Sequence, residues 1–476
     1  MFGICLGHHV GLPAIPWILL RIDIDNTMNS TALPPPPPRK PPPTLPPELV
    51  HQILLDIQEN PLDLLACSLV CSTWYHEART LLSDSCFQDI LKTRLTCLDA
   101  VRVTTLLVES HRLCLDYCAL LTELTIPVGA LLNDTNAYDS QAAEAYRTIL
   151  RITPNMHDLC IYTRNCPPSI SPDIIRSIHA FYLGLTPLCG AITSLRLHHS
   201  GKITALVDFL PRLIDSLAPH LESFETEYFP LRVPMQNALR GCRYLREIHV
   251  LHGKCGDLIP LPSAWPDLCR FRALGLFAED HEDADRLALA LADSCRRLVE
   301  VILTLHRSFD GSDEEFSSSA LGHLVERCPD VRSFAVRSGR IDDAFLYALA
   351  RGQPRLERLK LTDAEWLTGN ALSLEPRAGW WPELWQLVLK KCVSIEWEFV
   401  ERVVMECPKL RMVGLPEHLT TRRDVQELMR RLGFQCVSCS ELEESEYWDF
   451  YTSWTWRRIV TDDGDSSGQH RSVYGK

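Results

Sequence analysis

The chain has 476 residues, of which 46% are hydrophobic, and a formal net charge of −13. This hydrophobic content is typical of packed globular proteins and excludes a chain that is disordered throughout. The acidic balance lacks the positive charge that a phosphate backbone attracts, so we expect no nucleic-acid partner. The length suits about two to four domains or one extended repeat domain.

The cysteine content and the apolar runs bear on the compartment. The 19 cysteines are too sparse for a disulfide scaffold, and an odd number cannot all pair within one chain. We therefore expect reduced thiols in an intracellular protein, cytoplasmic or nuclear. No run of about 18 or more apolar residues occurs, so we expect no membrane span and no membrane partner. Residues 1–20 are apolar, but they lack Lys and Arg and contain His8, His9, Pro13 and Pro16, which does not fit a signal peptide.

Residues 1–43 are predicted to be a disordered leader followed by a polyproline tether. Positions 34–38 and 41–43 are all proline. Proline lacks an N–H and fixes φ, so this run favours a stiff, extended segment. Pro35, Pro38 and Lys40 also fit a PxxP ligand, although we favour the spacer on composition.

Residues 44–88 are predicted to form three short helices. Apolar residues at helical spacing follow Pro47, and Asn60-Pro61 is typical of a second helix start. Ser72 or Thr73 can cap a third helix. So small a module cannot bury all of its large apolar residues. The surplus predicts an exposed apolar face that binds a partner, or else a face that packs against the rest of the chain.

Several stretches of this module match one family. They are Leu45-Pro46-Pro47-Glu48-Leu49, Ile53-Leu54, Leu64-Leu65 and Leu69-Val70-Cys71-Ser72-Thr73-Trp74. Together they resemble the F-box, although Gln58-Glu59-Asn60 stands where the family often has Leu-Pro. The resemblance implies binding to the Skp-type adaptor of an SCF ubiquitin ligase, and through it to cullin. The residues it implies for the adaptor contact are Leu45, Pro46, Leu49, Ile53, Leu54, Leu64, Leu65, Leu69, Val70, Cys71 and Trp74.

Residues 89–440 are predicted to form a repeat array with caps. A pattern of apolar-x-x-apolar-x-apolar recurs ten times, at steps of 24 to 36 residues, close to the period of leucine-rich repeats with insertions. The triplets are Met156/Leu159/Ile161, Ile192/Leu195/Leu197, Leu221/Phe224/Thr226, Leu245/Ile248/Val250, Phe271/Leu274/Leu276, Leu298/Val301/Leu303, Val331/Phe334/Val336, Leu356/Leu359/Leu361, Leu384/Leu387/Leu389 and Leu410/Val413/Leu415.

The intervals between the triplets show helical spacing, as at Leu287, Ala290 and Leu291. A repeated strand and helix predicts a curved solenoid with the strands on the concave side. Four cysteines stand three residues before a triplet, where a small residue tolerates burial: Cys242, Cys295, Cys328 and Cys407. The array resembles leucine-rich repeats of the ribonuclease-inhibitor and cysteine-containing classes. The predicted fold class is thus α then α/β solenoid, a three-helix F-box followed by a leucine-rich-repeat-like array.

The C-terminal end is predicted to close the array. Residues 422–432 favour a helix and 434–437 a last strand. Residues 441–476 form an acidic tail, whose end at 461–476 is expected to be disordered. Its aromatic cluster covers the open end of the array or contacts a peptide, and we favour the first because a solenoid end must be closed. The cluster is Tyr447, Trp448, Phe450, Tyr451, Trp454 and Trp456.

Sequence motifs for metal binding, catalysis or cofactor binding are absent or incomplete. Cys436 and Cys439 form the only CxxC, and no second ligand pair stands at a matching distance, so no metal is expected. His198-His199 is expected on a loop surface, and the acidic runs 280–283 and 313–315 favour solvated loops. No catalytic motif and no cofactor motif is present. A modest cationic patch is possible in or near two predicted strands, although a solvated face is favoured: Arg332, Arg337, Arg358 and Lys360.

Together these patterns favour a non-catalytic substrate-recognition subunit of an SCF-type ubiquitin ligase. The F-box would bind the adaptor and the repeats would bind a protein target. The alternative is an interaction scaffold that binds no adaptor, in which the three helices only cap the array.

Overall fold

The structure is a computed structural model of the whole chain. It describes residues 45–458 except for positions 58–60, 82–96, 114, 116, 134, 164–169, 199–207, 281, 307–314, 371–379 and 438–454. The predicted leader and polyproline tether, and the predicted disordered end at 461–476, lie outside the described residues. So do His199, Cys439 and five members of the aromatic cluster.

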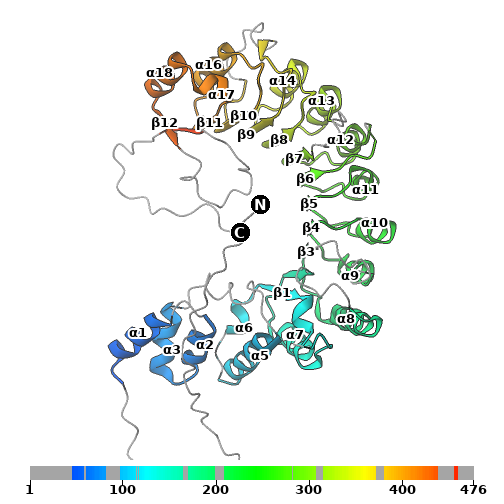
Figure 1. The fold of residues 1–476 in the computed structure, drawn as a ribbon, viewed down its shortest axis with the longest axis vertical. Helices are drawn as coiled ribbons and strands as arrows, with labels where there is room; N and C mark the ends of the chain where they lie inside the picture. The colour runs from blue at the N-terminus through cyan, green and yellow to red at the C-terminus, as the bar shows by residue number, and fades with distance from the viewer. Residues whose placement is uncertain are drawn as a thin grey trace, which may run out of the picture. The chain divides into compact units, whose positions relative to one another are not determined.

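Within these ranges the strands form one open sheet of thirteen strands (Figure 1). Strands β1 to β11 follow chain order and pair in parallel, and β13 and then β12 complete the sheet antiparallel. The bounds are β1 Glu123–Pro127, β2 Asp158–Tyr162, β3 Ser194–His198, β4 Ser223–Glu227, β5 Glu247–Leu251, β6 Arg270–Leu276, β7 Glu300–Leu305, β8 Ser333–Arg337, β9 Arg358–Thr362, β10 Gln386–Lys390, β11 Met412–Gly414, β12 Phe434–Val437 and β13 Thr455–Arg458.

The helices alternate with these strands, which confirms the predicted α/β solenoid. Parallel strands require such a crossover between each pair. The bounds are α1 Pro47–Asp56, α2 Pro61–Ser68, α3 Ser72–Leu81, α5 Cys97–Arg112, α6 Tyr117–Leu120, α7 Ser140–Ile152, α8 Pro172–Leu185, α9 Leu210–Leu217, α10 Val233–Arg240, α11 Cys255–Leu258, α12 Asp283–Ser294, α13 Ser318–Arg327, α14 Asp343–Gly352, α16 Trp397–Glu406, α17 Glu417–Thr420 and α18 Arg423–Arg431. Short 3-10 turns are η1 Val128–Leu131, η2 Thr186–Leu188 and η4 Pro262–Ala264.

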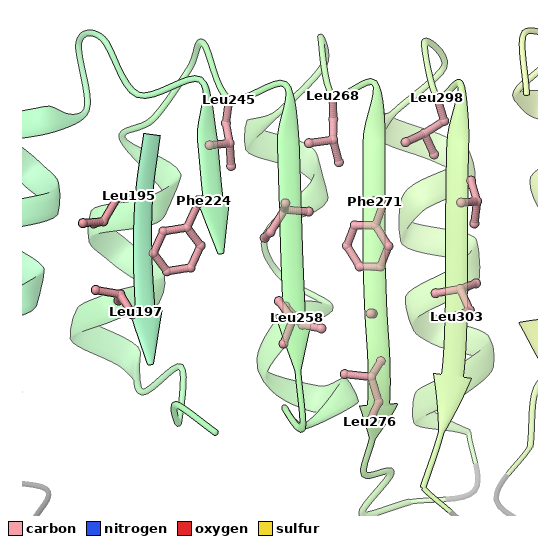
Figure 2. Packing of buried hydrophobic residues seen from close by; sticks show 14 of the residues in the cluster. Leu195, Leu197, Phe224, Leu245, Leu258, Leu268, Phe271, Leu276, Leu298 and Leu303 are labelled. Atoms are coloured by element: carbon pink, nitrogen blue, oxygen red, sulfur yellow. The ribbon is translucent and has the colours of Figure 1, made fainter. Parts of the chain in front are cut away.

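The apolar triplets form the core between sheet and helices. Because side chains alternate along a strand, the apolar residues of each strand point to the helices and the residues between them point away. Figure 2 shows buried apolar side chains along β3 to β7, with the helices behind the strands. We call the side of the sheet turned away from the helices the helix-free face. One continuous cluster of buried residues runs from Val50 to Trp456.

The register corrects one predicted triplet. Phe271 pairs with Ile248 of β5 and Val301 of β7, which are second members of their triplets. The fifth triplet therefore begins three residues earlier, at Leu268, and Figure 2 shows Leu268 level with Leu245 and Leu298. The prediction was shifted because β6 continues past its triplet, through an irregular register between Ala273 and Leu276.

Gly275 explains how β6 makes this irregular turn. Its φ is +64°, a region that L side chains rarely adopt. A Cβ at this position would also lie 2.9 Å from Nδ1 of His252. Glycine therefore meets both the backbone and the packing requirement.

One further repeat, inside the predicted range 89–440, precedes the first of the ten triplets. Strand β1 pairs with β2 so that Leu124 lies beside Leu159 and Ile126 beside Ile161. With Leu121, these residues form another buried triplet. The long interval before β2, which contains η1 and α7, hides this triplet from a search for a fixed period.

A buried turn precedes nearly every strand and explains the cysteines. In this turn the carbonyl of Cys295 accepts a hydrogen bond from the N–H of Leu298 at 3.3 Å, and Cys242, Cys328 and Cys407 accept in the same way. The Cys328 thiol in turn faces the Cys295 carbonyl, with Sγ and O 3.4 Å apart. The Cys295 thiol likewise faces the carbonyls of Pro262 and Trp265, so in these repeats the turn side chain links one repeat to the one before it.

Other residue types occupy the same turn position and form stronger links. The Trp265 indole N–H donates to the Leu239 carbonyl at 3.0 Å. The Gln353 amide donates to the carbonyls of Val325 and Cys328, at 2.5 and 2.8 Å. The requirement is therefore a buried side chain that can face the carbonyls of the preceding turn, and not cysteine as such.

The C-terminal end is closed in an order that chain sequence does not reveal. Strand β12 and helix α18 form where they were predicted, but β13, from the predicted tail, lies between β11 and β12. Trp456 of β13 is buried and pairs with Val413 of β11. This one described member of the aromatic cluster therefore helps to cover the end of the sheet.

Among the described residues, no helix has the length and apolar content needed to cross a bilayer.

We expect the change Gln353→Leu to destabilise the array by about 1–3 kcal/mol, because the buried Val325 carbonyl loses its side-chain donor and the Cys328 carbonyl loses one of its two donors. Urea unfolding followed by circular dichroism would measure this as a lower midpoint. The control is Gln141→Leu, since Gln141 is exposed at the start of α7 and its side chain should contribute less than about 0.5 kcal/mol. Equal midpoints for the two variants would contradict a role for Gln353 in linking the repeats.

Candidate functional site

The first candidate site is the module of helices α1, α2 and α3. Both α1 and α2 pack against α3, and His51 of α1 contacts Glu77 of α3 with Nδ1 and Oε2 3.0 Å apart. The centre of the module is apolar and fully buried. Its buried residues are Val50, Leu54, Leu64, Leu65 and Ala78.

Other apolar side chains of the module remain exposed. Leu49 is 53% exposed and Ile53 is 40% exposed, and the spacing of four residues places both on one side of α1. Leu45, just before the helix, is 46% exposed, and Val70, between α2 and α3, is 64% exposed. Large apolar residues are costly to leave in water, so these four indicate a contact surface. We call Leu45, Leu49, Ile53 and Val70 the exposed apolar set.

The structure divides the residues that the F-box resemblance assigns to the adaptor. Six are exposed: the exposed apolar set with Pro46 and Cys71. Leu69 and Trp74 are half-buried and belong to the edge of the core. Leu54, Leu64 and Leu65 have 0% exposure, so in this structure they support the module from inside and present no surface to a partner.

The opposite side of the module contacts the start of the array. Asp63 of α2 forms an ion pair with Arg102 of α5. Tyr75 of α3 meets Tyr117 of α6 edge-on, with ring centroids 6.0 Å apart. Burial raises the pKa of Tyr117, although its hydrogen bond with Ser68 acts in the opposite direction. The module therefore packs on the array, as the alternative expected, and still leaves an apolar surface outside that contact.

The second candidate site is the helix-free face of the sheet. The charge of its side chains changes sign along the array. On the strands β1 to β5 acids predominate at the positions that point away from the helices. His198 contacts Glu227 with Nδ1 and Oε2 2.8 Å apart, so this histidine belongs to β3 and not to the predicted loop surface. The acids of this half are Glu123, Asp158, Glu225, Glu227 and Glu247.

Glu225 is held as a carboxylate within this acidic half. Burial by itself raises its pKa, but the His249 ring, 3.7 Å from its Oε1, and the nearby His198 and Arg196 together lower the pKa below the usual value. Glu225 therefore keeps its negative charge across the neutral range.

On the strands β6 to β10 the helix-free face is instead basic. Arg337, Arg358 and Lys360, which the sequence analysis allowed as a cationic patch but favoured as a solvated face, occupy outward positions of β8 and β9. Arg332 lies in the turn before β8, where it contacts Glu357 at 3.4 Å. Four further cations of this surface were not predicted: Arg270, Arg272, Lys390 and Lys391. Alternation after Leu389 could have placed Lys390. Arg270 and Arg272 needed the corrected register of β6, and Lys391 follows the end of β10.

In the part of the chain that the structure describes, no group of three or more His, Cys, Asp or Glu residues has the arrangement to hold a metal ion. The acidic runs at 280–283 and 313–315 fall partly on residues outside that part.

No family model matches the chain. It is 25% identical to F-box protein At4g02760 of Arabidopsis thaliana over 156 residues, which are 32% of this chain and 29% of that protein. The chain is thus weakly similar to an F-box protein and spans less than a third of its length. A chain of the yeast Rad7 and Elc1 complex superposes with a TM-score of 0.38 and 15% identity, covering 79% of this chain and 96% of that one. A chain of the TLR13–ssRNA13 complex superposes with a TM-score of 0.33 and 12% identity, covering 58% of this chain and 33% of that one.

We expect iodoacetamide at pH 8 to modify Cys71 quickly and Cys295 hardly at all in the folded chain. Cys71 is exposed, whereas burial raises the pKa of Cys295 to about 12 and keeps it a neutral, inaccessible thiol. Peptide mapping by mass spectrometry would measure the two rates. Urea should remove the difference, and equal rates without urea would contradict the buried turn.

Proposed function

We propose that this protein is a substrate-recognition subunit of an SCF-type ubiquitin ligase. In this proposal α1 to α3 bind a Skp-type adaptor, and through it cullin, and the array binds a protein target. The reduced thiols of the sequence fit a cytoplasmic or nuclear location.

The observation that carries the proposal is the exposed apolar set. These four side chains lie at positions where the F-box resemblance expects adaptor contacts, while the remaining apolar residues of the module are used in its own core or against the array. A module that only capped the array would have no use for apolar side chains outside both contacts. The weak similarity to an Arabidopsis F-box protein supports the same function.

The mechanism in this proposal is positional. The adaptor holds the module, and the array holds a target so that its lysines stay near a ubiquitin-conjugating enzyme. Tethering raises the effective concentration of the reacting groups to the millimolar range, which accelerates transfer without new chemistry. This chain then contributes contacts and no catalytic residue.

We expect the double change Leu49→Asp and Ile53→Asp to weaken adaptor binding at least about 100-fold, because an unpaired charge buried in an interface costs about 3–5 kcal/mol. Titration of the full chain with purified Skp-type adaptor by calorimetry would measure it. Leu54 and Leu65 are unsuitable for this test, because they lie in the core and their replacement would unfold the module.

The matched control is Leu289→Asp with Met405→Asp. Leu289 on α12 is 39% exposed and Met405 on α16 is 62% exposed, close to the values for Ile53 and Leu49. Both lie on helices of the array, so adaptor affinity should not change. Absence of adaptor binding by the unmodified chain would overturn the ligase function and favour the scaffold that binds no adaptor.

A further inference from the structure

We propose that the helix-free face of β6 to β10 binds a segment of the target that is rich in Asp and Glu. This inference rests on the proposed function, because it names the kind of target that the array would present to the ligase. Its basis is the charge of the side chains on the sheet face.

A buried carboxylate on β7 has more than one cation around it. The side chain of Glu300 on β7 is 4% exposed. Its Oε2 lies 2.8 Å from Nη2 of Arg272 and 3.9 Å from Nε of Arg270, and its Oε1 lies 3.4 Å from Nη2 of Arg358. Glu300 thus lies among three guanidinium groups from β6 and β9, of which that of Arg270 is also paired with Glu247, with Nη1 and Oε1 2.6 Å apart. Each guanidinium has five N–H donors, so the group keeps both positive charge and donors for a further acid.

A second buried acid with cations around it lies near the ends of β8 to β10. Asp363 has a side chain that is 2% exposed and a φ of +60°, and its Oδ2 lies 2.6 Å from Nε of Arg337. Its Oδ1 lies 3.7 Å from Nζ of Lys391, which also has a positive φ, of +54°. Here too the buried acid fixes two cations and neutralises only one of them.

The spacing of these cations indicates a linear ligand. They come from β6, β8, β9 and β10, and neighbouring strands are about 4.8 Å apart, so the positive charge extends over about 19 Å. An extended peptide of about six residues has this length. Several carboxylates along such a segment would meet the distributed charge, whereas one phosphate group would meet only one end of it.

The rest of the molecule makes this surface selective. The whole chain has a net charge of −13, so a positive face is not a general property of its surface. On the same side of the sheet, β1 to β5 carry mainly acids, which would repel an acidic segment that moved along the array. The change of sign therefore limits the segment to β6 to β10.

The test uses the full chain and a fluorescein-labelled peptide of about eight alternating Glu and Asp residues. Its counterpart has Gln and Asn at the same positions. We expect fluorescence anisotropy to show saturable binding of the acidic peptide only, weakened as salt is added.

The double change Lys360→Gln and Lys390→Gln should weaken acidic-peptide binding about three- to tenfold, since each removes one cation from the face. The control Arg355→Gln with Lys409→Gln removes the same charge from the turns before β9 and β11, where both side chains are mostly exposed. It should leave the affinity unchanged.

Three results would overturn the inference: no preference for the acidic peptide, an equal loss in both double variants, or tighter binding of the amide peptide when it carries a single phosphoserine. The last would make the face a phosphate site instead. Adaptor titration of the Lys360→Gln, Lys390→Gln variant separates the two proposals, because adaptor affinity should equal that of the unmodified chain. If the unmodified chain does not bind the adaptor, the ligase function is overturned, but the peptide-binding result is not affected.

Discussion

The buried turn before each strand is the constraint on which the rest of this structure depends. Parallel strands cannot be joined by a tight hairpin, so the chain must return across a helix and enter the next strand at the same level each time. The turn sets that level, because its carbonyl accepts from the first triplet residue and its side chain faces the carbonyls of the turn before. An error in one turn would move the apolar residues of the following strand out of the core.

The correct strand register also separates the two faces of the sheet, an apolar face toward the helices and the helix-free face. Once the apolar residues of every strand point to the helices, the residues between them align in rows on the helix-free face. Glu123 of β1 and Asp158 of β2 then lie beside one another, and the cations of β6 and β9 gather around Glu300. Residues that are far apart in the chain become one charged surface, because the strands stack in chain order.

The N-terminal module uses the same division between support and surface. Leu54 and Leu65 are buried and hold the three helices together, and Asp63 and Tyr75 contact the start of the array. Leu49 and Ile53 share a helix with Leu54, yet they face outward. The module is thus attached to the array on one side and presents an apolar surface on the other, and the proposed bridging function requires both.

The sequence by itself determined the periodic part of this protein. Apolar triplets and helical spacing predicted the repeats, and a short signature predicted the three helices, because both are local patterns of side chains. Only the tertiary structure decided where the fifth triplet begins, since the pairing of Phe271 with Ile248 depends on a neighbouring strand. It also decided the position of β13 between β11 and β12, which depends on pairing with β11 and does not follow chain order. Within the signature, burial separated Leu54, Leu64 and Leu65 from Leu49, Ile53 and Val70, because exposure is set by what packs against a residue and not by its identity. The basic face likewise needed the stacked strands, since no segment of the sequence contains Arg272, Glu300 and Arg358 together.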